Sequence, residues 1–142
     1  MQIDVQAHMP RAQVHAIFVV VPRVNMATLI TMIETMRVAI YLALRPVFSW
    51  EVVSFDGAKV TASNAMVATV TLANDGLPPA DRVFVLGSWG AEHCRARALV
   101  AWLRLRARAG ARIWRVELGS SPYLNSGMTS LQNIRSERCC AA

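Results

Sequence analysis

Short apolar runs alternate along this chain with longer stretches of helical periodicity. Residues 16–21 (AIFVVV) form a continuous run of mostly β-branched residues that ends at Pro22, which is typical of a strand buried on both faces. Other runs have the length and composition of strands and are followed by turn-forming residues. We therefore predict long strands at 16–21, 48–54, 82–86 and 112–116, and short extended pieces at 59–62 and 65–70.

Two helices are predicted between these strands. The first spans 26–44 and would end at Arg45-Pro46, because proline cannot continue a helix. The second spans 91–109 and is followed by Gly110, a suitable C-cap. On the second helix we expect an inner face of Leu99, Trp102 and Leu103, and an exposed face of Arg97, Arg104 and Arg108.

This alternation predicts an α/β fold. Strands separated by helices pair in parallel, so we expect a doubly wound, mostly parallel sheet with helices on both faces. Ligands bind such sheets outside the carboxyl ends of the strands. Three loops would converge there, at 22–25, 87–90 and 117–121.

The first helix also raises the question of a membrane span. Residues 26–44 approach the ~20 apolar residues that cross a bilayer. Glu34 and Arg37 lie inside this stretch, and each would cost ~2.5–3.5 kcal/mol at the bilayer centre. We therefore favour a helix packed against a sheet, with Glu34 and Arg37 facing a cleft or each other, and expect no membrane partner.

Composition indicates one domain without a nucleic-acid footprint. The 142 residues carry a net charge of +6, from 14 Arg and a single Lys at position 59. The Arg residues are spread from Arg11 to Arg138, which favours a solvated surface over a phosphate-binding patch. We expect the same of the second predicted helix, which carries Arg95, Arg97, Arg104, Arg106 and Arg108.

The cysteines and histidines offer no metal site, and we expect no cofactor. Cys94, Cys139 and Cys140 have neither a disulfide framework nor metal-ligand spacing. Free thiols and a polar N-terminus without a signal peptide favour a cytoplasmic location.

The segment after the last predicted strand resembles a nucleophile elbow. Residues 112–116 run into a tight turn at Glu117-Leu118-Gly119, an arrangement that presents one side chain above the ends of a parallel sheet. The presented residue would be Glu117, which is neither Ser nor Cys. The segment has the layout of a catalytic turn without its nucleophile.

An ordered series of motifs runs through residues 16–127. Its segments are Val20-Val21-Pro22 through Ile33-Glu34, Trp50 to Gly57 (WEVVSFDG), Val60 to Ser63, Pro78 to Gly90 and Leu99 to Ile113. This series resembles one known family, the amidotransferase-like (ThiJ/PfpI superfamily) domain at the N-terminus of GlxA-like AraC/XylS-type transcription regulators. The resemblance implies a flavodoxin-like, class I glutamine amidotransferase-like fold and a homodimer. It also implies that any DNA contact belongs to a helix-turn-helix region that this chain lacks.

The chain departs from the family at the elbow and at its C-terminus. Glu117 stands where the family carries Cys, Trp114 and Arg115 replace small residues, and Gly87-Ser88 replaces Gly-Gly. After Gly127 the sequence no longer follows the family. We therefore expect a tail at 1–13, the α/β domain at 14–127 and a divergent segment at 128–142. A truncated or frame-shifted gene product, or an excised part of a longer protein, would explain that segment.

Catalysis is not expected, because no thiolate stands at the elbow. Cys94 lies in the wrong element, and His8, His15 and His93 are poorly placed partners. The alternative to a regulator domain is a stand-alone ThiJ/PfpI-like hydrolase or stress protein that has lost its nucleophilic cysteine.

Binding of a small effector, such as an amino acid or an amine, is the stronger hypothesis. The resemblance places Glu34 beside the elbow residue Glu117, and carboxylates next to an aromatic wall at Trp89 suit a cationic ligand. Another interpretation is a buried Glu34–Arg115 or Glu117–Arg37 ion pair in a pocket that binds nothing. The predicted ligand-binding residues are Glu34, Ser88, Trp89, Arg115, Glu117 and Leu118.

Overall fold

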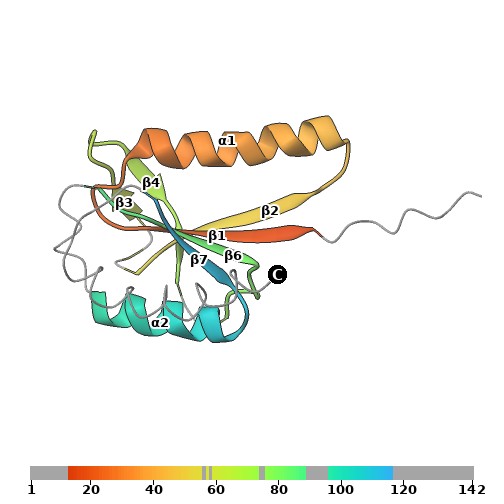
Figure 1. Ribbon diagram of the computed structural model, residues 1–142. Coiled ribbons are helices and arrows are strands. Elements are labelled where there is room, and N and C mark those ends of the chain that lie inside the picture. The colour runs from red at the N-terminus through yellow and green to blue at the C-terminus, as the bar shows by residue number, and fades with distance from the viewer. Residues whose placement is uncertain (1–12, 56, 58, 74–75, 89–95, 117–142) are drawn as a thin grey trace, which may run out of the picture.

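The central element of the fold is a five-stranded parallel sheet (Figure 1). A computed structural model describes residues 13–55, 57, 59–73, 76–88 and 96–116 of the chain. The strand order is β5-β2-β1-β6-β7, and every pairing within the sheet is parallel. Its strands are β1 (Val14–Val20), β2 (Phe48–Ser54), β5 (Thr71–Leu72), β6 (Arg82–Leu86) and β7 (Arg112–Val116).

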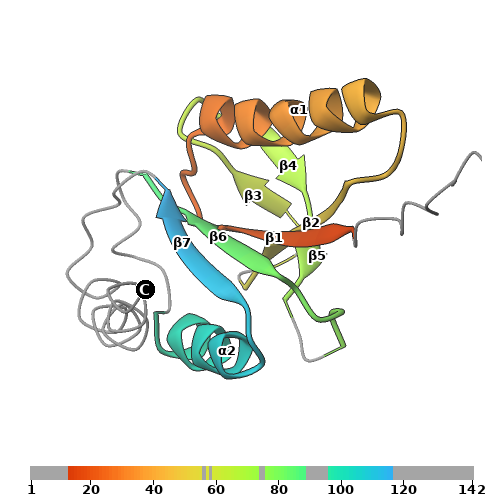
Figure 2. The ribbon, with the colours of Figure 1, turned by 45° about the vertical axis from the view of Figure 1, so that its right-hand side comes forward.

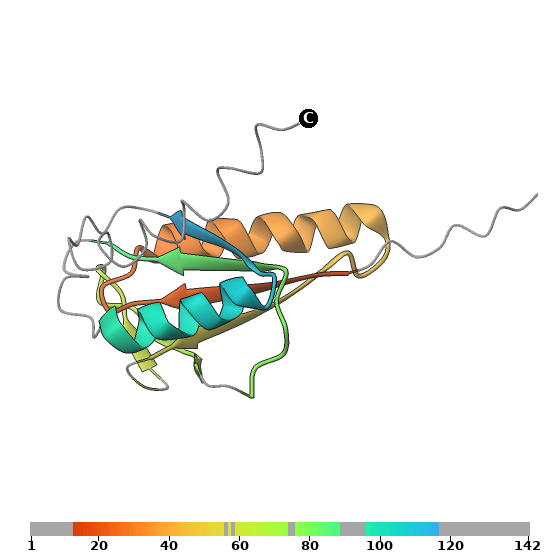
Figure 3. The same ribbon diagram turned by 60° about the horizontal axis from the view of Figure 1, so that its bottom comes forward.

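Two helices cover opposite faces of this sheet, as Figures 1 and 3 show. The first, α1 (Met26–Ala43), follows β1, and the second, α2 (Ala96–Arg108), precedes β7. Two further strands, β3 (Lys59–Thr61) and β4 (Val67–Thr69), form a separate antiparallel hairpin on the α1 side (Figure 2). The predicted α/β, mostly parallel, flavodoxin-like fold is confirmed.

Each face of the sheet has its own apolar core, because successive residues of a strand point to opposite sides. Ile17 and Val19 of β1 pack toward α2, where Leu99, Trp102 and Leu103 are buried. Phe18 and Val20 pack toward α1 and the hairpin. At these positions β1 is fully buried or nearly so, which confirms the prediction from its continuous apolar run.

The two helices bury their apolar residues to different degrees. The inner face of α2 lies in the core, while Arg97, Arg104 and Arg108 are exposed as predicted. On α1, by contrast, only Met26 and Leu29 are buried. Among the described residues, α1 is the one helix long and apolar enough to cross a membrane, a criterion that the core helix of a globular protein also meets.

Several predicted boundaries needed correction. His15, predicted to precede the first strand, lies within β1, where its Nδ1 is 2.8 Å from Ser49 Oγ. The two-residue strand β5 was not predicted, and the extended pieces at 59–62 and 65–70 pair as the hairpin. The second helix is described only from Ala96 onward.

Asp81 ties together the amino ends of three strands. Its backbone N–H donates to His15 O at 2.9 Å, and its carboxylate Oδ2 accepts from His15 N at 2.8 Å. Its carbonyl oxygen accepts from Arg112 N at 2.9 Å. The starts of β1, β6 and β7 are thereby held in register by one residue.

Candidate functional site

The carboxyl ends of β1, β6 and β7 meet at one edge of the sheet, where the sequence predicts the ligand site. Val21 N donates to Leu86 O at 3.2 Å, and Gly87 N donates to Val116 O at 3.5 Å. Hydrogen bonding therefore continues one residue past the ends of β1 and β6. The loops that begin at Pro22 and Gly87 leave the sheet side by side, which is the arrangement expected of a binding edge in parallel sheets.

The loop after β1 is held in a fixed shape. Arg23 has a left-handed backbone conformation with φ of 64°, and its N–H donates to Thr61 O of β3 at 2.8 Å. Val24 O accepts from Ser63 N at 3.0 Å, so the hairpin side of the molecule holds this loop at two points. Asn25 then caps α1 by accepting a hydrogen bond from Ala27 N at 3.0 Å. The start of α1 is thus fixed next to the carboxyl edge.

Two buried serines lie at the carboxyl ends of strands. Ser88 follows β6 and is 8% exposed, and Ser54 ends β2 and is fully buried. Buried hydroxyl groups are normally hydrogen-bonded, so a serine in this position orders its surroundings. Ser88 is one of the predicted site residues, whereas Ser54 is not.

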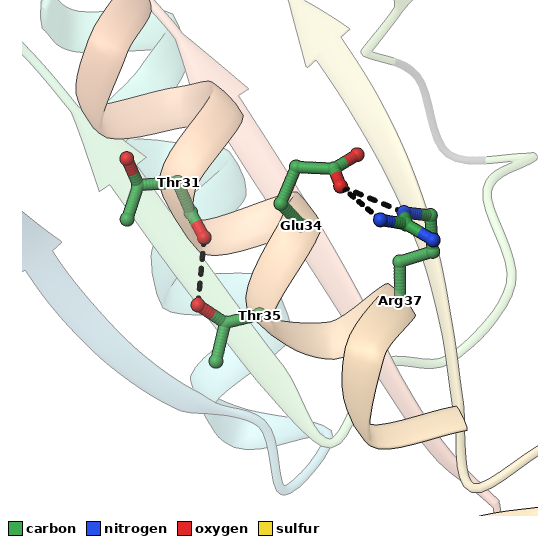
Figure 4. Close-up of polar contacts among 4 residues, drawn as sticks. All are labelled: Thr31, Glu34, Thr35 and Arg37. Carbon is green, nitrogen blue, oxygen red and sulfur yellow. Dashed lines mark hydrogen bonds and ion pairs between the residues drawn. The ribbon is translucent and has the colours of Figure 1, made fainter. Parts of the chain in front are cut away.

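Glu34 lies on the exposed side of α1 and is bonded to Arg37 (Figure 4). Arg37 Nε donates to Glu34 Oε2 at 2.7 Å, and Arg37 Nη2 is 2.6 Å from the same oxygen. The hydrogen bond from Arg37 holds the pKa of the Glu34 carboxyl below its usual value, although desolvation acts in the opposite direction. The sequence predicts that Glu34 and Arg37 face either a cleft or each other, and the structure shows that they face each other.

Arg115 lies on the opposite face of the sheet from Glu34. Its neighbour Ile113, two residues earlier on β7, packs against the core on the α2 side, and alternate residues of a strand share a face. The buried Glu34–Arg115 ion pair considered from the sequence is therefore wrong, because the sheet separates the two side chains and Glu34 bonds to Arg37 instead. Trp89, Glu117 and Leu118 lie outside the described residues.

Arg106 corrects the prediction that the arginines of α2 form a solvated face. Its side chain is 8% exposed, and its guanidinium donates to Pro78 O at 2.8 Å and to Leu77 O at 3.1 Å. The guanidinium also lies over the ring of Trp102, 4.8 Å from its centroid. Arg106 thus attaches α2 to the loop before β6, which is a structural role.

Metal ligands are not gathered anywhere in the part of the chain that the structure describes. No group of three His, Cys, Asp or Glu residues comes close enough there to hold an ion.

The chain is similar in sequence to known transcription regulators. It is 30% identical over 111 residues to the HTH-type transcriptional regulator GbdR of Pseudomonas aeruginosa. The matched region covers 78% of this chain and 30% of GbdR. The chain therefore spans about a third of the length of this curated relative. No protein-family model matches the chain.

Solved structures show the same fold. An AraC family transcriptional regulator from Pseudomonas putida superposes with a TM-score of 0.69 at 19% identity, covering 82% of this chain and 62% of that one. A THiJ/PfpI family protein from Pseudomonas syringae gives a TM-score of 0.59 at 16% identity, covering 82% of this chain and 46% of that one. The family resemblance predicted from the sequence is confirmed.

Proposed function

Because the chain resembles the ThiJ/PfpI-like domain of AraC-type transcription regulators in both sequence and fold, we propose that it is a non-catalytic, ligand-sensing domain of such a regulator. The observation that carries the proposal is the 30% identity to a regulator over 111 residues, 78% of this chain. DNA binding belongs, in this proposal, to a helix-turn-helix region outside this chain. The whole regulator acts in the cytoplasm.

The proposed ligand site lies at the carboxyl edge, around the loops that follow β1, β6 and β7. Ser88 lies at this edge, and the turn after β6 continues into Trp89. Glu117 and Leu118 follow the last residue of β7 directly. A carboxylate at Glu117 and an indole at Trp89 suit a small cationic ligand, such as an amine or an amino acid, through ion pairing and cation–π attraction.

Glu34 and Arg115 are flanking residues in this proposal. The exposed carboxylate of Glu34 is already bonded to Arg37, and Arg115 lies on the α2 side of the sheet. Neither position favours direct contact with a ligand held at the carboxyl edge. Substituting each of them separately tests this assignment.

Thermal unfolding against a panel of amines and amino acids tests the proposal. A ligand at 100 times its Kd stabilises the folded state by about 2.7 kcal/mol. For a domain of this size, that corresponds to a rise in Tm of roughly 5–10 °C. We expect Trp89→Ala and Glu117→Gln to abolish the rise, and Glu34→Gln and Arg115→Gln to preserve it. A well-folded protein that no cationic compound stabilises contradicts the sensing role.

The similarity to a THiJ/PfpI family protein supports a second candidate function, that of a stand-alone hydrolase or stress protein that has lost its nucleophilic cysteine. Glu117→Cys separates the two. Hydrolytic activity that appears in this variant, and disappears when the thiol is alkylated, favours the enzyme ancestry. A variant that stays inactive while it binds the same ligand favours the regulator.

A further inference from the structure

Three exposed arginines of α2 lie in a line along the helix, which we call the α2 arginine stripe: Arg97, Arg104 and Arg108. With 3.6 residues per turn, their spacings place all three within an arc of roughly 40° around the helix axis. The rise of about 1.5 Å per residue spreads them over about 16 Å along that axis. The α2 arginine stripe is therefore a narrow band of positive charge that follows most of the helix.

The fold directs this band away from the rest of the domain. Leu99, Trp102 and Leu103 lie on the other side of α2, about 180° from the α2 arginine stripe, and are buried in the core. Arg106 lies on that inner side too and attaches the helix to the loop before β6. Because α2 is held along its inner side, the positions that carry the α2 arginine stripe are fixed relative to one another.

Acidic side chains of the described residues do not neutralise the α2 arginine stripe. The described helix, 96–108, contains neither Asp nor Glu. The acidic residues elsewhere in the described ranges are Glu34, Glu51 and Asp81. None of them forms an ion pair with an arginine of the α2 arginine stripe, and Glu34 is bonded to Arg37 on the other side of the sheet. A band of positive charge without carboxylates between its members attracts an anionic partner.

We propose that the α2 arginine stripe contacts the phosphate backbone of double-stranded DNA. Its guanidiniums start from positions spread along a line, which matches an extended polyanion better than a single small anion. Each DNA strand carries a phosphate about every 3.4 Å along the helix axis, and arginine binds phosphate through two parallel hydrogen bonds. The inference rests on the proposed function in one point, the choice of DNA as the polyanion that a transcription regulator meets.

This contact adds to a helix-turn-helix region and does not replace it. Phosphate contacts position a protein on the duplex, whereas contacts with base edges read the sequence. The family resemblance alone implies that all DNA contact lies outside this chain, and the arginines are spread along its whole length. Only the helix geometry gathers three of them into one band. The α2 arginine stripe would thus hold the sensing domain against DNA next to the bases that the other region reads.

An anionic membrane surface matches α2 less well. A helix that binds in a bilayer surface inserts its apolar face between the lipids. The apolar face of α2 is already buried against the sheet, and α2 would have to leave the domain to expose it. The outward side of the helix presents a narrow line of charge, which corresponds to a strand of phosphates more closely than to a plane of head groups.

Fluorescence anisotropy of short labelled duplexes, titrated with the 142-residue chain, tests the proposal. Three phosphate contacts predict a slope of about −2.7 for log K against log salt, or roughly 40-fold weaker binding at ~200 mM than at ~50 mM NaCl. Two duplexes of unrelated sequence should bind equally, since phosphate contacts do not distinguish bases.

Substitutions separate the α2 arginine stripe from net charge. Arg104→Gln should weaken binding at low salt and reduce the magnitude of the slope by about 0.9. The triple variant Arg97→Gln/Arg104→Gln/Arg108→Gln should abolish binding. Lys59→Gln is the matched control, because it also removes one exposed positive charge, but from the hairpin on the α1 side of the sheet (Figure 2). It should bind as the wild type does, and far-UV circular dichroism checks that all variants are folded.

Several results would overturn the proposal. One is a wild-type chain that binds no duplex at the lowest salt, and another is a folded triple variant that binds as tightly as the wild type. A Lys59→Gln variant as weak as Arg104→Gln would show that net charge alone is responsible. A chain that binds polyglutamate but no duplex would assign the α2 arginine stripe to an acidic protein, and one that binds only phosphatidylserine vesicles would assign it to a membrane. The thermal-shift test for ligands uses other variants, so the two proposals can fail separately.

Discussion

Replacing Arg106 tests whether a buried guanidinium on a helix rich in arginine is structural. Arg106→Met keeps an unbranched apolar stem of similar length and removes the guanidinium. The change deletes the two hydrogen bonds to Leu77 O and Pro78 O and the stacking over Trp102. Everything else on the exposed side of α2 stays as it is, so the effect reports on this one group.

The expected loss follows from those three contacts. Hydrogen bonds from a charged donor contribute about 1.5–3 kcal/mol each, and a largely desolvated cation–π contact contributes up to about 2 kcal/mol. These terms share one group and are not additive, and the methionine stem recovers part of the burial. We therefore expect a decrease of about 3 kcal/mol in the free energy of unfolding, or roughly 10 °C in Tm.

Urea unfolding followed by circular dichroism measures this decrease, with Arg104→Met as the matched control on the same helix. Arg104 is exposed, so its substitution should change stability by no more than about 0.5 kcal/mol. The slope of the unfolding transition should stay the same in both variants, since the fold is retained. A cost for Arg106→Met equal to that of the control would refute the structural role.

Two further predictions concern acid stability and the end of α2. Because Arg37 lowers the pKa of Glu34, the folded state gains stability from this carboxylate above its unfolded value of 4.5 and loses it as the pH falls through the lowered pKa. Glu34→Gln should therefore be less stable than wild type near neutral pH and should approach it in acid; a difference that grows on acidification would contradict this. Gly110 has φ of 102°, and an added Cβ would meet nothing within 4 Å. Gly110→Ala should therefore cost about 1–2 kcal/mol through backbone strain alone, and Gly110→Asn less, both measured by urea unfolding.

The sequence predicts the strands and α2 well because their apolar residues follow a clear pattern. β2 and β7 have the predicted bounds, and the inner face of α2 is the predicted one. Gly110 also ends α2 as predicted: its N–H donates to Ala107 O, and Ala111 N donates to Arg106 O, both at 3.0 Å. In these elements, local pattern and tertiary packing agree.

The sequence predicts α1 less well, because apolar residues occur on all its sides. Ile30 and Ile33 differ in burial, although nothing in their local sequence separates them: Ile30 is 48% exposed, while Ile33 packs against the core. Which side faces the sheet depends on where the helix is docked, and that is a property of the whole fold. The exposed apolar face could not have been identified without the structure.

For Arg106 and for part of the candidate site, too, the local sequence does not predict contacts that depend on tertiary packing. Spacing places Arg106 in a run of alternating arginines, and only the loop before β6 makes its position a buried one. The carboxyl edge was predictable because it follows from parallel topology, and Ser88 lies there. The sequence leaves the orientation of Glu34 open between a cleft and Arg37, because an i, i+3 ion pair and a cleft contact have the same sequence pattern; the structure shows the ion pair.

The hydrogen bonds of Asp81 lie at one edge of the sheet, and the proposed ligand site lies at the other. They fix the relative positions of β1, β6 and β7 at the amino edge, far from the loops at the carboxyl edge. Those loops can therefore change in sequence or length without shifting the strands that carry them. A domain built in this way can acquire a new ligand preference during evolution, because the hydrogen bonds that fix its strands lie at the amino edge of the sheet and are not altered. The low identity to structures of the same fold, 19% and 16%, is consistent with that freedom.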